Sequence, residues 1–128
     1  MSRLYHVEIA RFAADTDPKW IDNLLSHFDI PGVERSKQGI SRRITLDGIL
    51  HIALIRRLNR ELHISVGSAV ALSARLLASH SASAEVGIGL ELRVDRPALE
   101  HEIGRRVNDA VESSIRPRRG RPSKRAIE

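Results

Sequence analysis

Five polar side chains between residues 19 and 27 are spaced so that a helix would present them on one face. They are Lys19, Asp22, Asn23, Ser26 and His27. An amide such as Asn23 can pair with the edge of adenine, and a cation such as Lys19 can contact guanine or a phosphate. We therefore expect this face to suit contact with base edges in the major groove of DNA.

Residues 33–44, which follow this helix, form a second group of candidate contacts. They are expected to form a short β-hairpin or extended loop that turns near Gly39. Its basic side chains are Arg35, Lys37, Arg42 and Arg43. Cations placed beside a helix in the groove would neutralise backbone phosphates. The competing interpretation is a plain helical core with a solvated basic loop.

The C-terminal residues 116–128 hold the whole net charge of +5. Six of the 21 basic residues and one of the 16 acidic ones lie there, which leaves 15 of each in residues 1–115. Because like charges repel, this segment is predicted to be a disordered basic arm that binds a polyanion.

Within this tail, the sequence Pro117-Arg118-Arg119-Gly120-Arg121-Pro122-Ser123-Lys124 is similar to an AT-hook. The resemblance implies binding in the narrow minor groove of A·T-rich double-stranded DNA. The glycine would allow close approach to the groove floor, the arginines would enter its negative potential, and the proline would keep the chain extended. The candidate contacts are Arg118, Arg119, Gly120, Arg121, Pro122 and Lys124. The alternative is a generic solubilising or nucleic-acid-binding tail.

The elements that position these groups are predicted from apolar spacing and from helix caps. Four helices are expected, over residues 5–13, 18–28, 45–62 and 65–77. Asp17, Thr45 and Ser65 should begin the last three, because their side chains accept hydrogen bonds from free backbone N–H groups. A tight polar turn between the first two helices, followed by a basic hairpin and another helix, predicts a winged helix-turn-helix domain over residues 1–78.

After residue 83 the period of apolar residues changes from helix to strand. Five apolar residues alternate with other types: Val86, Ile88, Leu90, Leu92 and Val94. A lone strand is unstable in water, so we expect it to pair with its own copy in a homodimer, although residues 33–44 or the N-terminus are alternative partners. A final helix opening at Pro97 is expected to pack its apolar stripe across the same interface. That stripe is Leu99, Ile103, Val107, Ala110 and Val111.

The predicted fold is thus mainly α with small β: a winged helix-turn-helix, then a strand–helix dimerisation segment over residues 84–115, then the tail. A strand followed by a helix also occurs in ribbon-helix-helix proteins, where paired strands enter the major groove. Only one helix follows here, which favours dimerisation.

Several local sequences resemble a MerR-type DNA-binding domain. They are Glu8-Ile9-Ala10-Arg11, Asp17-Pro18-Lys19, residues 39–47 with their Arg42-Arg43-Ile44-Thr45 run, Leu54-Ile55-Arg56-Arg57-Leu58, and Ile64-Ser65. The resemblance covers about residues 5–77 and implies a winged helix that binds DNA as a dimer. The chain departs from it in a first turn without glycine, in His63 where glycine is usual, and in lacking the long coiled coil and effector-binding cysteines.

Enzymatic and metal-binding patterns are missing from the sequence. There is no Cys, and the six His residues are scattered without ligand spacing. His101-Glu102 opens a His-Glu-x-x-His pattern, but Arg105 stands at the place of the second His. We expect no enzymatic activity, no cofactor and no metal. No apolar run is long enough to span a bilayer, so a cytoplasmic, nucleoid-associated protein is expected.

The combined hypothesis is a dimeric DNA-binding protein, either a transcriptional regulator or an architectural protein of the nucleoid. The alternative is an antitoxin-like or adaptor protein. In that case residues 84–115 would grip another protein, and DNA binding would serve autoregulation.

Overall fold

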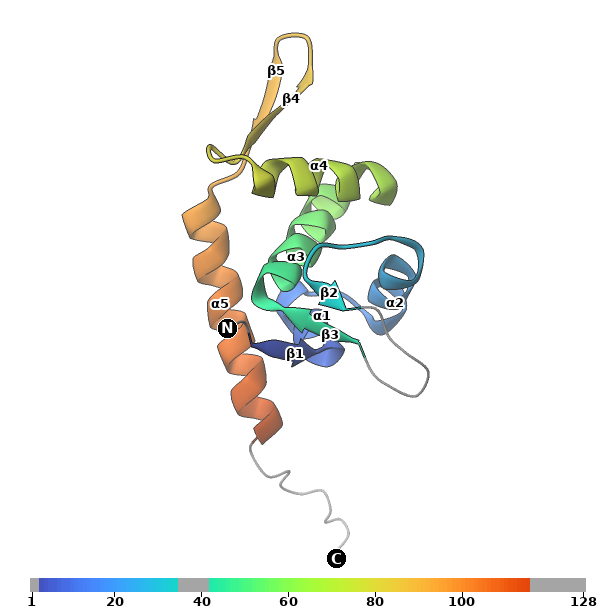
Figure 1. The fold of residues 1–128 in the computed structure, drawn as a ribbon, viewed down its shortest axis with the longest axis vertical. Coiled ribbons are helices and arrows are strands. Elements are labelled where there is room, and N and C mark those ends of the chain that lie inside the picture. The colour runs from blue at the N-terminus through green and yellow to red at the C-terminus, as the bar shows by residue number, and fades with distance from the viewer. Residues whose placement is uncertain (1–2, 35–41, 116–128) are drawn as a thin grey trace, which may run out of the picture.

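Five helices and five short strands make up residues 3–34 and 42–115, the part of the chain that the computed structural model describes (Figure 1). In chain order they are β1 (Leu4–His6), α1 (Val7–Ala14), α2 (Pro18–His27), β2 (Val33–Glu34), β3 (Arg43–Thr45), α3 (Leu46–Glu61), α4 (Val66–Ala78), β4 (Ser83–Gly87), β5 (Leu90–Arg93) and α5 (Arg96–Ile115). The described chain is mainly helical with two small antiparallel sheets, as the sequence predicts.

The predicted helix caps are confirmed. The side-chain oxygens of Asp17, Thr45 and Ser65 accept hydrogen bonds at 2.7, 3.0 and 3.4 Å, each from the backbone N–H three residues further on. These bonds satisfy N–H groups that lack a partner within the helix. Local sequence therefore fixes where α2, α3 and α4 begin.

A three-stranded sheet, ordered β1-β3-β2, lies beside the first two helices. β3 is central, and Tyr5 of β1 and Val33 of β2 both pair with Ile44. The predicted start of the first helix at Tyr5 was wrong, because residues 4–6 form β1 and the helix begins at Val7. Three residues are too few to show alternation, and their partner lies far along the chain. The pairing of β2 with β3 confirms the two ends of the predicted hairpin.

A close backbone contact joins the end of α2 to the start of α3. Gly32 has φ +85° and its carbonyl accepts a hydrogen bond from the Thr45 N–H at 2.9 Å. A Cβ atom at residue 32 would lie 2.5 Å from Thr45 Oγ1 and 2.6 Å from the Gly48 nitrogen. Only glycine therefore permits this approach.

Helix α5 packs against α1 and α3 of its own chain (Figure 1). Its stripe is buried, with Ile103 and Val107 only 1% and 2% exposed, and it joins the same hydrophobic core as α1 to α4. This corrects the expectation that Leu99, Ile103 and Val107 pack across a dimer interface. α1 and α3 present an apolar face that needs a cover, and α5 supplies it within one chain.

The predicted single strand over residues 86–94 is also corrected, because the structure has a β-hairpin there. β4 and β5 pair antiparallel around a two-residue turn, Ile88-Gly89, in which Gly89 has φ +77°. The alternation of apolar residues runs straight through this turn, so it could not show that the chain reverses. The hairpin projects beyond α4 (Figure 1). Leu92 and Val94 are half-buried near its base, whereas Val86, Ile88 and Leu90 are exposed.

Candidate nucleic-acid interface

The turn between α1 and α2 is held by its own backbone. Asp15 adopts the left-handed conformation at φ 58°, and its N–H donates to the Phe12 carbonyl at 3.2 Å. The Thr16 N–H donates to the Arg11 carbonyl at 3.1 Å. Aspartate is among the few residues besides glycine that tolerate this conformation, so it replaces the usual glycine here. The three-residue turn then leads directly into the Asp17 cap of α2.

Helix α2 separates its side chains into two faces. Ile21, Leu24 and Leu25 are buried in the core. The opposite side carries the five predicted contact residues, and all are exposed: Lys19, Asp22, Asn23, Ser26 and His27. The inner face therefore fixes the orientation of α2, while the outer face is open to a ligand.

The basic strand β3 is tied to the outer face of α2 by Arg42. One terminal guanidinium nitrogen lies 3.5 Å from Asp22 Oδ1, and the other donates to Ser26 Oγ at 3.4 Å. Arg43, the next residue, is exposed on β3. Three predicted contact residues thus come together, with Arg43 adjacent. The other candidate contacts, Arg35 and Lys37 and those of the tail, lie outside the described residues.

Sequence reasoning missed an aromatic contact that secures α2 to α3. The guanidinium of Arg56 lies over the Trp20 ring, 5.0 Å from its centre. A cation over an indole face is attracted by the ring electrons, and more so where water is partly excluded. Both residues are half-buried, and the pair fixes the first turn of α2, which carries Lys19. The Arg56-Arg57 pair in the sequence offered no means of telling which arginine faces the tryptophan.

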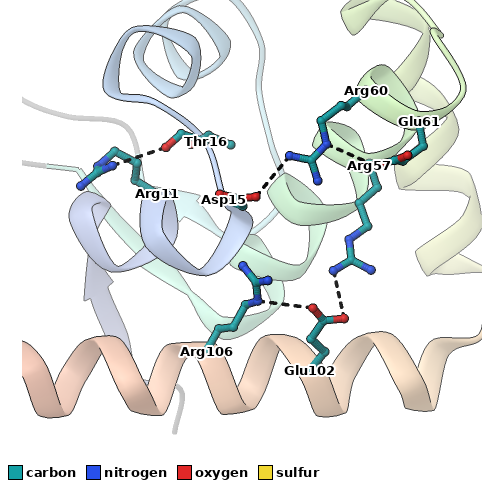
Figure 2. A network of polar contacts seen from close by, with 8 residues as sticks. All are labelled: Arg11, Asp15, Thr16, Arg57, Arg60, Glu61, Glu102 and Arg106. Carbon is teal, nitrogen blue, oxygen red and sulfur yellow. Dashed lines mark hydrogen bonds and ion pairs between the residues drawn. The ribbon is translucent and has the colours of Figure 1, made fainter.

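Ion pairs hold the turn before α2 against the rest of the protein (Figure 2). Arg60 of α3 contacts the Asp15 carboxylate at 3.3 Å. Glu102 of α5 contacts Arg57 at 3.0 Å and Arg106 at 3.3 Å. Of these contacts, the Asp15–Arg60 pair holds the turn, whereas Glu102 joins α5 to α3, and none of these residues belongs to the exposed face of α2.

Glu102 is the electrostatic centre of this network. The hydrogen bond from Arg57 and the charge of Arg57 lower the pKa of Glu102 below its ordinary value, and the charges of Arg106 and Arg105 lower it further. Partial burial opposes the shift by raising the pKa. The carboxylate is therefore held charged, because its charged form is the one that accepts these bonds.

Over residues 3–34 and 42–115, no three His, Asp or Glu side chains are grouped so that they could hold a metal ion. None of the helices in these ranges is both long and apolar enough to cross a membrane.

The chain matches no family model, no curated protein and no solved structure. The resemblances to MerR-type domains and to AT-hooks therefore rest on the local sequence motifs alone.

Proposed function

We propose that the protein binds double-stranded DNA through the outer face of α2. The proposal rests on the two faces of α2. Its inner face is packed in the core, whereas all five polar residues of its outer face are exposed. A rigid helix with an open polar face is what major-groove recognition requires.

In this proposal α2 enters the major groove as the second helix of a winged helix-turn-helix. Asn23 is placed to pair with an adenine edge, and Lys19 contacts guanine or a phosphate. Arg42 and Arg43 lie beside the helix and contact phosphates. Among the described residues, neither Lys19 nor Asn23 has a side-chain partner that would compete with DNA.

Asp22 has a different role from the other residues of this face. A carboxylate near phosphates is repelled, but its contact with Arg42 offsets part of that cost. Asp22 therefore acts as a positioning residue, which holds the guanidinium beside α2 and sets how far β3 stands from the groove.

The basic tail supports the same function from the sequence alone. Arg119 and Arg121 would enter an A·T-rich minor groove next to the site read by α2. If the tail contributes most of the DNA affinity, the protein is an architectural protein. If α2 contributes most of it, the protein is a site-specific regulator.

The test compares random and A·T-rich duplexes over a salt series, using the full chain and two asparagine variants. Asn23→Ala should weaken binding to the preferred duplex by about 1–3 kcal/mol. Asn108→Ala, which changes another exposed asparagine, on α5, should bind like the unchanged protein. Equal affinities for the two variants would remove α2 as the reading helix, and no binding to any duplex would end the proposal.

A second candidate function is favoured by the apolar tip of the β4–β5 hairpin. Val86, Ile88 and Leu90 are exposed there, which is unusual unless another protein covers them. In an antitoxin-like or adaptor protein this tip would grip a different chain. A small protein that co-purifies with the unchanged chain, but not with Ile88→Ser, would support it.

A further inference from the structure

The two outer edges of the β4–β5 hairpin differ in how they are protected. β4 lies against α4, carries a bulge between Glu85 and Gly87, and its Glu85 carbonyl accepts a hydrogen bond from Arg75 at 3.0 Å. Bulges and occupied carbonyls blunt an edge. In residues 3–34 and 42–115, the outer edge of β5 pairs with no strand. β5 is therefore the open edge.

The register shows which main-chain groups this edge presents. Val94 donates to the Ala82 carbonyl at 2.9 Å, and the pairs Ser83–Arg93, Ala84–Leu92 and Glu85–Glu91 follow in order. Hydrogen-bonded and non-hydrogen-bonded pairs alternate in an antiparallel ladder. The N–H and C=O groups of Glu91 and Arg93 therefore point outward, away from β4.

We propose that two copies of this chain pair antiparallel along β5, with Leu92 on the two-fold axis. The two hairpins then form one four-stranded sheet. In this register Glu91 faces Arg93 of the second copy, twice by symmetry, and each pair exchanges two main-chain hydrogen bonds. The outward direction of these groups matches the pairing without any rearrangement of the hairpin.

Charge complementarity identifies the second copy as the occupant. Within one chain Glu85 and Glu91 are directly opposite each other, which is unfavourable for like charges. Among the described residues, no ion pair involves Glu85, Glu91 or Arg93. The pairing brings Arg93 of the second copy to Glu91, so both uncompensated charges gain a partner. For residues 90–94, the register with Leu92 on the axis places opposite charges together. With Glu91 or Arg93 on the axis, two like charges would meet.

The apolar side chains support the same arrangement. Leu92 meets Leu92 on the axis, and Leu90, 63% exposed in the single chain, faces Val94 of the second copy. Ile88 at the tip is fully exposed, at 102%, and antiparallel pairing of the two β5 strands brings each tip toward the base of the other hairpin. There the hairpin base forms an open hollow of about 810 Å³, lined in part by Val94, Arg96 and Pro97. Each tip thus lies near a hollow of the other copy.

The first measurement is the oligomeric state of the full chain by sedimentation equilibrium, which should show a dimer. Glu91→Arg sets two Arg–Arg pairs across the axis and should raise the dissociation constant by about tenfold or more. Arg93→Glu should do the same through two Glu–Glu pairs. A mixture of the two variants restores opposite charges at both positions and should give heterodimers. Glu112→Arg, which reverses the charge of an exposed residue on α5, should not alter the mass of the assembly.

The melting temperature of the variant distinguishes loss of dimerisation from unfolding. Glu91→Arg replaces the Glu85–Glu91 repulsion with an attraction, so its melting temperature, extrapolated to low concentration, should be unchanged or higher. The chain contains no Cys, so Leu92→Cys should form a symmetric disulfide under mild oxidation, while Val86→Cys on β4 should not.

The pairing does not depend on DNA binding, and the two can fail separately. A monomeric unchanged chain would overturn it. So would a dimer that both charge reversals leave intact, or failure of the mixed variants to associate.

Discussion

Arg42 and Asp22 contact each other at 3.5 Å although they lie twenty positions apart in the sequence. This contact links the basic strand β3 to the outer face of α2. It also means that the positive charge of Arg42, the residue before β3, is partly compensated before DNA is bound.

Asp22→Asn should therefore strengthen binding to every duplex. The substitution keeps an acceptor for Arg42, removes a carboxylate that repels phosphates, and leaves the guanidinium charge uncompensated. The slope of log affinity against log salt should steepen by about 0.9, equivalent to one additional phosphate contact. Arg42→Gln should change both quantities in the opposite direction. Fluorescence anisotropy over a salt series measures them. A loss restricted to one sequence would mean that Asp22 itself contacts a base.

Replacing Arg119 and Arg121 of the tail by alanine should weaken binding and flatten the salt slope by about 1.8, which corresponds to two lost cationic contacts. The preference for A·T-rich duplexes should decrease as well, because the AT-hook resemblance places both arginines in the minor groove. Arg105→Ala is the control, since this exposed arginine lies on α5, across the molecule from α2 (Figure 1). Unchanged affinity and slope in the double variant would exclude the tail from binding.

Gly32→Ala should destabilise the protein by about 3 kcal/mol or more. The new Cβ would lie 2.6 Å from the Gly48 backbone nitrogen, and the backbone is already in the left-handed region. Gly104→Ala on α5 meets open space and should raise the stability by about 0.5–1 kcal/mol. Chemical denaturation measures both values. Similar unfolding midpoints for the two variants would contradict the close contact between Gly32 and Gly48.

Glu102→Gln should lower the stability at neutral pH by about 0.5–1 kcal/mol, because Arg57 and Arg106 lose a charged partner. The pKa of Glu102 is lowered in the folded protein, so its contribution is complete above the ordinary value that holds in the unfolded chain and is lost as the pH falls through the folded value. The difference between the variant and the unchanged protein should therefore shrink in acid. Glu112→Gln, exposed on the same helix, should show no difference at either pH. A constant difference for Glu102→Gln across this range would mean that the loss does not depend on its charge.

Local rules predicted the helix starts and the outer face of α2. Asp17, Thr45 and Ser65 act through hydrogen bonds to residues three positions away, so their effect is readable in sequence. The five polar residues of α2 are likewise exposed because of their spacing against Ile21 and Leu24.

The features that were missed depend on contacts between distant residues. β1 exists because Ile44 pairs with Tyr5, and α5 belongs to the core because α1 needs a cover. An apolar stripe indicates that a helix face is buried, but not whether the same chain or another one buries it. Gly89 was a sign of the hairpin turn, and the alternation on either side of it concealed the reversal.

The burial of α5 against α1 has a consequence for synthesis on the ribosome. α1 is made well before α5, and its apolar face stays uncovered until the buried residues of α5, which run to Ala110, have left the exit tunnel. The α1–α2 helix pair proposed to bind DNA is thus synthesised long before α5, the helix that covers its apolar face. A nascent chain halted before residue 96 should remain open to proteases and to chaperones that bind exposed apolar segments.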